Sequence, residues 1–251
     1  MEVVAITSAK GGTSKTSTTQ ALTYGLHAKG KTVLMIDADA QANLSFSSGV
    51  DFKAVQADLY SVFKGADIDK AILEIKPGLH IVPGSVALMA ADREFTGQRS
   101  FLILRDAVRK MQKQVDYVLI DTPPAVGLLT QNALAVADKL ILPMRPDGFG
   151  LQGLSQMMAY IDQQRKRTNP GLQIDGILLT QCNSRNNVDK IITEQIYKMA
   201  ERMGTKVYKS KIRMGTAVPA SGLMRKSIYD AYPKAGVTLD YSNFVDEFMG
   251  V

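Results

Sequence analysis

The chain has 251 residues, of which 45% are hydrophobic and 22% are charged, as in an ordinary globular protein, and its net charge is +6. No apolar run approaches the ~20 residues that span a bilayer, and strand-like residues follow Met1 directly, so we expect neither a membrane span nor a signal peptide. The single Cys182 excludes an internal disulfide and a four-cysteine metal site within one chain. We expect it to be a buried apolar side chain in a reducing cytoplasm.

Short apolar runs alternate with amphipathic stretches along the chain. The runs at 3–8, 32–36, 79–82, 115–120, 139–143, 176–180 and 206–208 predict strands, and the stretches at 16–29, 100–114, 151–167, 188–203 and 244–249 predict helices. Nearly continuous apolar strands are typical of a parallel sheet that is buried on both faces. We therefore expect an α/β fold in which a doubly wound, mainly parallel sheet carries helices on both faces, as one domain over residues 1–251.

A glycine-rich loop follows the first predicted strand and opens the first predicted helix. Residues 10–17 read Lys-Gly-Gly-Thr-Ser-Lys-Thr-Ser. The glycines let the backbone curl around phosphate oxygens, Lys15 supplies an ammonium group, and Thr16 supplies a hydroxyl for Mg²⁺. A second lysine, Lys10, stands at the front of the loop. It is better placed to reach the phosphates of a facing subunit than those of its own nucleotide.

Carboxylates follow two of the predicted strands, at the sheet edge where ligands of such folds bind. Asp37 and Asp39 are two residues apart, which places both on one side if the backbone stays extended. One of them can order the hydration shell of Mg²⁺ or contact Thr16, and the other can polarise an attacking water. Asp121 precedes two prolines, at 123–124, which stiffen the segment after it. An aspartate in this place is typical of a Walker-B aspartate near Mg²⁺.

These motifs together resemble those of the ParA/MinD group of ATPases with a deviant Walker-A loop, most closely the short DNA partition ATPases of the ParA type. The family's K-G-G-x-G-K-[ST] loop corresponds to residues 10–16, its D-x-D-x-Q element to residues 37–41, and its D-x-P-P element to residues 121–124. The stretch at 176–185 also resembles a strand and loop of the family, and 208–231 resembles its C-terminal region more loosely, so the resemblance covers nearly the whole chain.

The resemblance implies a role for each matching residue. Lys10 would reach the partner's nucleotide in an ATP sandwich dimer, Lys15 would hold the β- and γ-phosphates, and Asp39 would position the hydrolytic water. Mg²⁺ would be held at Thr16, with Asp37 and Asp121 close to it. At the end of the 176–180 strand, Asn183 and Arg185 can frame the adenine, although their run is also a common turn composition. The expected nucleotide-binding residues are Gly11, Gly12, Thr13, Ser14, Lys15, Thr16, Ser17, Asn183 and Arg185.

Basic residues gather in the second half of the chain, which is the electrostatic footprint of a polyanion binder or simply a solvated basic face. The resemblance implies a homodimer that forms with ATP, binds DNA without sequence specificity on the nucleoid, and is released when a ParB-like centromere-binding partner stimulates hydrolysis. No membrane partner is expected. The better candidates for DNA contact flank turn-like segments: Lys209, Lys211, Arg213, Arg225 and Lys226.

Three features depart from the family pattern. Ser14 replaces the glycine before the catalytic lysine, which costs on the order of 1 kcal/mol if that position needs φ > 0. Ala40 replaces the usual proline after the second aspartate, so this segment is expected to be looser. The element at 211–222 is also altered, which leaves the DNA-contact residues open.

Other classes share the loop and remain alternatives. A MinD-like membrane-cycling ATPase usually ends in a basic amphipathic helix, whereas residues 240–249 here are acidic. An electron-transfer protein like the nitrogenase iron protein needs bridging cysteines, which the single Cys182 does not fit, and a related tyrosine autokinase needs a terminal tyrosine cluster, which this sequence lacks. An ATP-gated scaffold with very slow turnover stays open because of Ser14.

Overall fold

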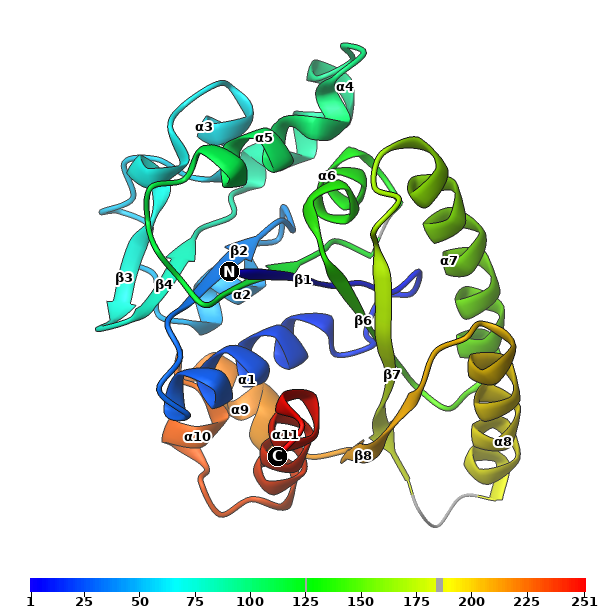
Figure 1. Cartoon of the computed structure of the whole chain (residues 1–251). Coiled ribbons are helices and arrows are strands. Elements are labelled where there is room, and N and C mark those ends of the chain that lie inside the picture. The colour runs from blue at the N-terminus through cyan, green and yellow to red at the C-terminus, as the bar shows by residue number, and fades with distance from the viewer. Residues whose placement is uncertain (125, 184–186) are drawn as a thin grey trace.

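The computed structural model describes the backbone of residues 1–124, 126–183 and 187–251, and the side chains of these residues except 149 and 187–190 (Figure 1). Within this part of the chain, an eight-stranded sheet has the order β3-β4-β2-β5-β1-β6-β7-β8. Neighbouring strands pair in parallel, except that β3 runs antiparallel to β4 at one edge. The strands are β1 (Glu2–Ile6), β2 (Val33–Asp37), β3 (Leu73–Lys76), β4 (Leu79–Val82), β5 (Tyr117–Asp121), β6 (Lys139–Met144), β7 (Gln173–Cys182) and β8 (Val207–Arg213).

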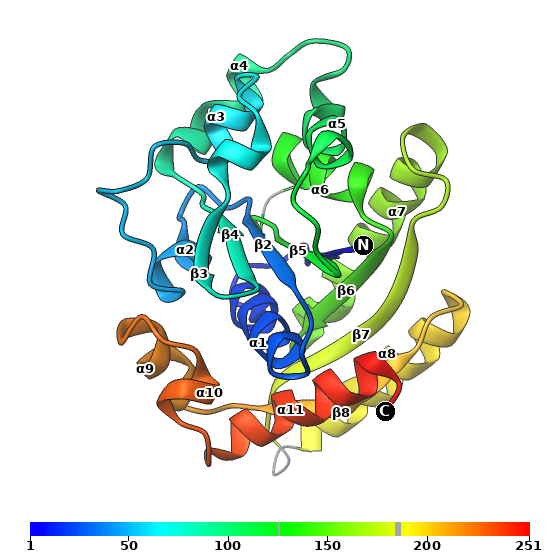
Figure 2. The same ribbon diagram turned by 60° about the vertical axis from the view of Figure 1, so that its left-hand side comes forward.

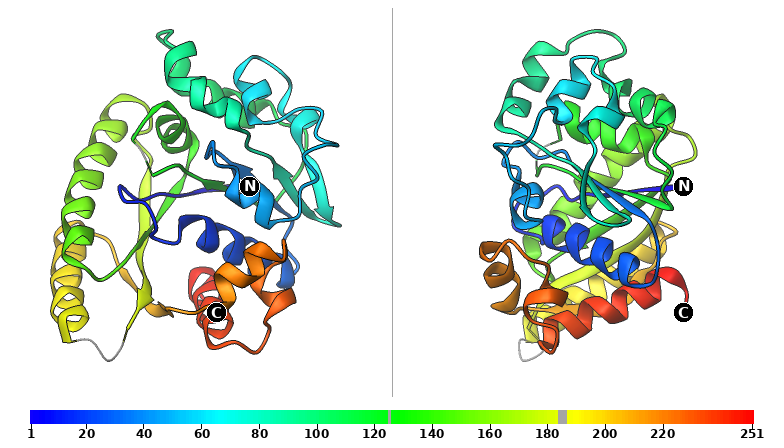
Figure 3. Two further views of the ribbon diagram at one scale, coloured as in Figure 1. Left: turned by 180° about the vertical axis from the view of Figure 1, so that it is seen from behind. Right: turned by 90° about the vertical axis from the view of Figure 1, so that its left-hand side faces the viewer.

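Helices cover both faces of the sheet, as Figures 2 and 3 show from three sides. One face carries α1 (Lys15–Ala28), α10 (Ile228–Ala231) and α11 (Gly236–Met249), with α2 (Asn43–Ser47) and α9 (Ala217–Leu223) beside them. The other face carries α3 (Leu59–Phe63), α5 (Ile103–Lys110), α6 (Leu128–Val136), α7 (Gly148–Arg167) and α8 (Asn187–Arg202), with α4 (Ala91–Glu94) beyond them. Short 3₁₀ turns complete the layer: η1 (Ile68–Ala71), η2 (Val86–Ala90) and η3 (Ser100–Leu102). The expected doubly wound α/β fold is confirmed.

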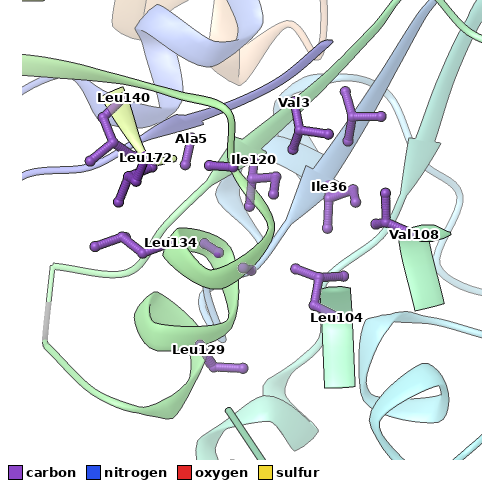
Figure 4. Close-up of a cluster of buried hydrophobic side chains, with 14 of the residues drawn as sticks. Val3, Ala5, Ile36, Leu104, Val108, Ile120, Leu129, Leu134, Leu140 and Leu172 are labelled. Carbon is purple, nitrogen blue, oxygen red and sulfur yellow. The ribbon is translucent and has the colours of Figure 1, made fainter. Parts of the chain in front are cut away.

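Successive residues of the strands other than β3 supply two separate cores. Val3 and Ala5 of β1 pack toward α5 and α6, whereas Val4 and Ile6 pack toward α1 and α11. Figure 4 shows the first of these cores, in which strand residues such as Ile120 lie opposite helix residues such as Leu134. Because both faces of the strands are buried, their sequences are nearly continuous apolar runs rather than alternating ones.

The structure changes several predicted elements at the margins of the fold. The antiparallel strand β3 was not expected, because its pattern is half exposed and short. The helix predicted at 100–114 is η3 followed by a shorter α5, and the last helix begins at Gly236 rather than at 244. The last strand extends to Arg213, because buried Tyr208 and Ile212 alternate with exposed basic residues. Cys182, expected to be buried, is only partly buried against the core near the sheet edge.

Candidate active site

The loop between β1 and α1 has a left-handed backbone at two positions. Gly12 has φ 71°, and Ser14, which precedes the first residue of α1, has φ 66° and ψ 26°. This position therefore does adopt positive φ, the condition under which the serine is costly, and a serine there is strained by about 1 kcal/mol. The Ser14 hydroxyl does not cap α1. It accepts a hydrogen bond from Nε2 of Gln181 at 3.0 Å instead.

Lys15 lies inside the loop. Its side chain is buried, and Nζ donates to the backbone oxygen of Lys10 at 3.3 Å. Burial lowers the pKa of Lys15, and the carboxylates of Asp121 and Asp39 oppose that shift. An ammonium group that is desolvated and aimed across the loop is well suited to neutralise phosphate oxygens, because electrostatic interactions strengthen where water is excluded.

Thr16 and Asp121 form the second part of the site. Thr16 Oγ1 donates to Oδ2 of Asp121 at 2.6 Å, and Thr19 Oγ1 lies 3.4 Å from the other carboxylate oxygen. Burial, followed by the charge of Asp37, raises the pKa of Asp121 to about 8. Hydroxyl and carboxylate oxygens are the ligands that Mg²⁺ prefers, and a divalent cation would offset two neighbouring buried carboxyls. These residues therefore fit the expected metal.

Asp37 and Asp39 do not act as a matched pair. β2 ends at Asp37, whose buried carboxylate accepts from the backbone N and the hydroxyl of Ser45 at 2.8 and 2.6 Å. Burial raises the pKa of Asp37 to about 6. Asp39 instead lines a cavity that opens over the loop, and its Oδ1 accepts from the backbone N of Gln41 at 2.9 Å. The contact with Thr16 is made by Asp121, and of Asp37 and Asp39 only Asp39 lines the cavity.

Lys10 is held within its own chain. Nζ lies 3.0 and 3.3 Å from the two carboxylate oxygens of Asp147, and that carboxylate also caps α7 by accepting from the backbone N of Gly150 at 2.8 Å. Burial alone would raise the pKa of Asp147, but the hydrogen bonds from Lys10 and Gly150 hold it below its ordinary value. About a third of each side chain is exposed, so the pair is weakly stabilising and reversible.

A cavity of about 910 Å³ opens over the loop. Every residue from Gly11 to Ser17 lines it, and their nucleotide-binding role stays a prediction. The opposite wall comes from the end of β8 and from α9, and its members include Ile212, Met214 and Val218. The exposed Asn183 is outside the lining, and Arg185 falls outside the described residues, so their proposed adenine contacts stay predictions.

The basic candidates occupy different surroundings. Lys209 and Lys211 are exposed and lie within the edge strand β8, not beside a turn, and Lys226 is exposed after α9. Arg213 forms a two-bond pair with Asp240 at 2.7 and 2.8 Å. The Arg225 guanidinium bonds to backbone oxygens of residues 46 and 50 and stacks over the Phe46 ring. The two arginines are therefore engaged in holding the fold.

Sequence reasoning did not identify three polar residues that this site depends on. Ser45 joins Asp37 to the backbone N of Gly84, Asp147 holds Lys10, and Gln181 holds Ser14. The last two lie far along the chain from the loop, at the ends of β6 and β7. The one signal in the sequence is that both follow apolar strands, at the edge where ligands bind.

Comparison with known proteins agrees with this geometry. A family model described as an AAA domain matches residues 1–174, so the chain belongs to this family of P-loop ATPases. The chromosome partitioning protein ParA of Caulobacter vibrioides is 37% identical over 202 residues, which cover 78% of this chain and 75% of the relative. The sporulation initiation inhibitor protein Soj of Bacillus subtilis is 33% identical over 200 residues, covering 78% and 79%. The chain is thus a member of the ParA-type ATPases.

Solved structures resemble the fold over its full length. Cobyrinic acid a,c-diamide synthase from Mycobacterium smegmatis, with a bound ATP analogue and magnesium, superposes with a TM-score of 0.85. The two chains are 25% identical, and the match covers 99% of this chain and 94% of the other. The fold is therefore shared with an enzyme of a different reaction, so it does not by itself assign partition.

Proposed function

We propose that this chain is a DNA partition ATPase that binds Mg²⁺ and ATP, dimerises with ATP between the subunits, and binds DNA as a dimer. A ParB-like centromere-binding partner would stimulate hydrolysis and release the dimer from the nucleoid. The observation that carries the proposal is the second lysine, Lys10, which a partly exposed and reversible ion pair holds at the front of the loop. The likeness of the chain to partition proteins supports the same function.

The residues divide the hydrolytic work among them. Lys15 neutralises the β- and γ-phosphates from within the loop, where burial strengthens its field. Thr16 and Asp121 would hold Mg²⁺, which would supply charge neutralisation for the transferred phosphoryl group. Asp39 orients the attacking water from the cavity wall. Lys10 exchanges Asp147 for the phosphates of the partner subunit's nucleotide and acts in the manner of an arginine finger.

The last helix argues against the MinD-like alternative. Tyr241, Phe244 and Val245 of α11 are buried against α1 and β8, so its apolar side is used inside the fold. The carboxylate of Glu247 on the same helix accepts from the backbone N of Lys209 and Ser210 at 2.7 and 2.8 Å. Over the described ranges, no helix is both long and apolar enough to cross a membrane.

The switch is tested by DNA binding in three nucleotide states. Wild type should bind random-sequence duplex DNA about tenfold or more tightly with ATP than with ADP or without nucleotide. The reason is that a dimer binds the same duplex with two DNA-binding surfaces, one from each subunit. Lys10→Ala should lose the ATP effect. Lys53→Ala, which removes the same charge from an exposed loop, should retain it. Equal binding by wild type in all three states would contradict the proposal, and ATP-dependent flotation on anionic vesicles without DNA binding would favour the MinD-like alternative.

The exposed lysines of β8 give a second prediction. Lys209→Ala and Lys211→Ala should weaken DNA binding to the same extent on every sequence, and each should make the slope of log K against log salt shallower by about 1, as expected when one lysine no longer neutralises a phosphate. ATP hydrolysis without DNA should not change, since neither residue lines the cavity. Fluorescence anisotropy across a salt series measures the slope. A slope that equals that of the Lys53→Ala control would place the DNA surface elsewhere.

A further inference from the structure

Two adjacent side chains of β7 hold the phosphate loop from the side. Thr180 is buried, and its Oγ1 donates to the backbone oxygen of Thr13 at 3.1 Å. Gln181 Nε2 donates to the backbone oxygen of Gly12 at 2.7 Å and to the Ser14 hydroxyl at 3.0 Å. The three consecutive loop residues at 12–14 are therefore all bonded to the end of one strand.

An ordinary strand could not present both side chains to the same loop, because neighbouring residues point to opposite faces. Gln181 has φ 53°, a left-handed value that is uncommon for a residue other than glycine. The pairing of β7 with β8 is irregular between Leu179 and Cys182, which is where this residue lies. The local turn redirects the Gln181 side chain toward the loop and into the cavity wall.

Ser14 and Gln181 thus form a pair of strained residues that are joined through their side chains. A glycine at position 14 would adopt φ 66° readily but would offer no hydroxyl to Gln181. Backbone strain of this kind persists only where the surroundings fix it, and it gathers at functional sites. The second bond, to the oxygen of Gly12, fixes the other left-handed residue of the loop.

We propose that Gln181 is a positioning residue of the ATPase site, which holds residues 12–14 in the shape that receives the phosphates and offsets the serine at position 14. The inference rests on nucleotide binding at this loop, as in the proposed function, but on neither the dimer nor DNA. Gln181 acts through the loop backbone and takes no part in the chemistry. Its loss should therefore weaken nucleotide binding more than it slows turnover at saturation.

The test is a double-mutant cycle measured by binding of a fluorescent ADP analogue with Mg²⁺. Gln181→Ala should raise the Kd about tenfold, since two hydrogen bonds are removed and the strain at Ser14 is left unsupported. In the Ser14→Gly background the same change should raise the Kd only about threefold, because only the hydrogen bond to Gly12 is then removed. Gln173→Ala, an exposed glutamine at the other end of β7, is the matched control and should leave the Kd unchanged.

Two further measurements separate positioning from a general effect on folding. The Tm of the nucleotide-free variant should stay within about 2 °C of wild type, and kcat should fall less than KM rises. A Kd within twofold of wild type for Gln181→Ala, or equal losses in both backgrounds, would overturn the inference. If wild type itself fails to bind the analogue, the nucleotide site of the proposed function falls as well, so the two failures are distinguishable.

Discussion

Replacing Asp121 with asparagine should raise the stability of the nucleotide-free protein while abolishing its Mg²⁺-dependent ATP hydrolysis. The Asp121 carboxyl is fully buried beside Asp37, and its pKa is raised to about 8. A carboxyl whose pKa is higher in the folded than in the unfolded state favours folding fully below its unfolded pKa of about 4, and that contribution is lost as the pH rises toward about 8. Asparagine keeps an oxygen for the Thr16 hydroxyl but never ionises.

The gain in folding stability of Asp121→Asn over wild type should therefore grow with pH. With a chelator present, urea unfolding should show Asp121→Asn more stable than wild type by about 1–3 kcal/mol at pH 8, and by less at pH 5. Asp162→Asn, which removes the same charge from an exposed pair with Arg165, should change stability by less than about 0.5 kcal/mol at either pH. Adding Mg²⁺ and ADP should stabilise wild type but not Asp121→Asn. A variant that is less stable than wild type at pH 8 would show that the fold accommodates this carboxylate without strain.

The local parts of this site could be predicted from the sequence. The loop at 10–17 and the carboxylates of Asp39 and Asp121 lie at the ends of strands, as the sequence predicts. These features could be predicted because each depends only on residues that are adjacent in the sequence. The sequence also marked Ser14 as costly if its φ is positive, and the structure supplies that φ of 66°. Fold class was equally accessible, since β1, β2 and β5 are nearly continuous apolar runs that must be covered on both sides.

The remaining parts depend on contacts between distant segments. Asp147 meets Lys10 and Gln181 meets Ser14 only because β6 and β7 follow β1 in the order of the sheet, and strand order is not encoded in any single stretch. The far wall of the cavity likewise comes from β8 and α9. The roles of Arg213 and Arg225 could not be inferred from charge alone, because their partners lie on α11 and near α2.

Replacing Asp39 with alanine should slow ATP hydrolysis by about a hundredfold or more while ATP binding is retained. Asp39 is the one carboxylate of the D-x-D element that lines the cavity. The backbone N of Gln41 donates a hydrogen bond to this carboxylate and orients it. Removing a group that positions or activates the nucleophile typically costs 10²–10⁴ in rate. Neither Lys15 nor Thr16 loses a hydrogen bond in this variant, so the residues proposed to bind the phosphates and Mg²⁺ stay in place. Lys15 also loses one nearby negative charge, which does not disfavour phosphate binding.

The same variant should separate hydrolysis from assembly. If ATP makes the dimer and hydrolysis ends it, Asp39→Ala should stay on DNA with ATP long after wild type has dissociated, and Asp39→Ala with Lys10→Ala should not bind at all. Gln41→Ala is the matched control, because it lines the same cavity without a carboxylate and should dissociate like wild type. Dissociation after dilution into competitor DNA measures the difference. Rapid dissociation of Asp39→Ala, despite its slow hydrolysis, would mean that nucleotide exchange and not hydrolysis ends the DNA-bound state, because nucleotide exchange does not require a positioned water.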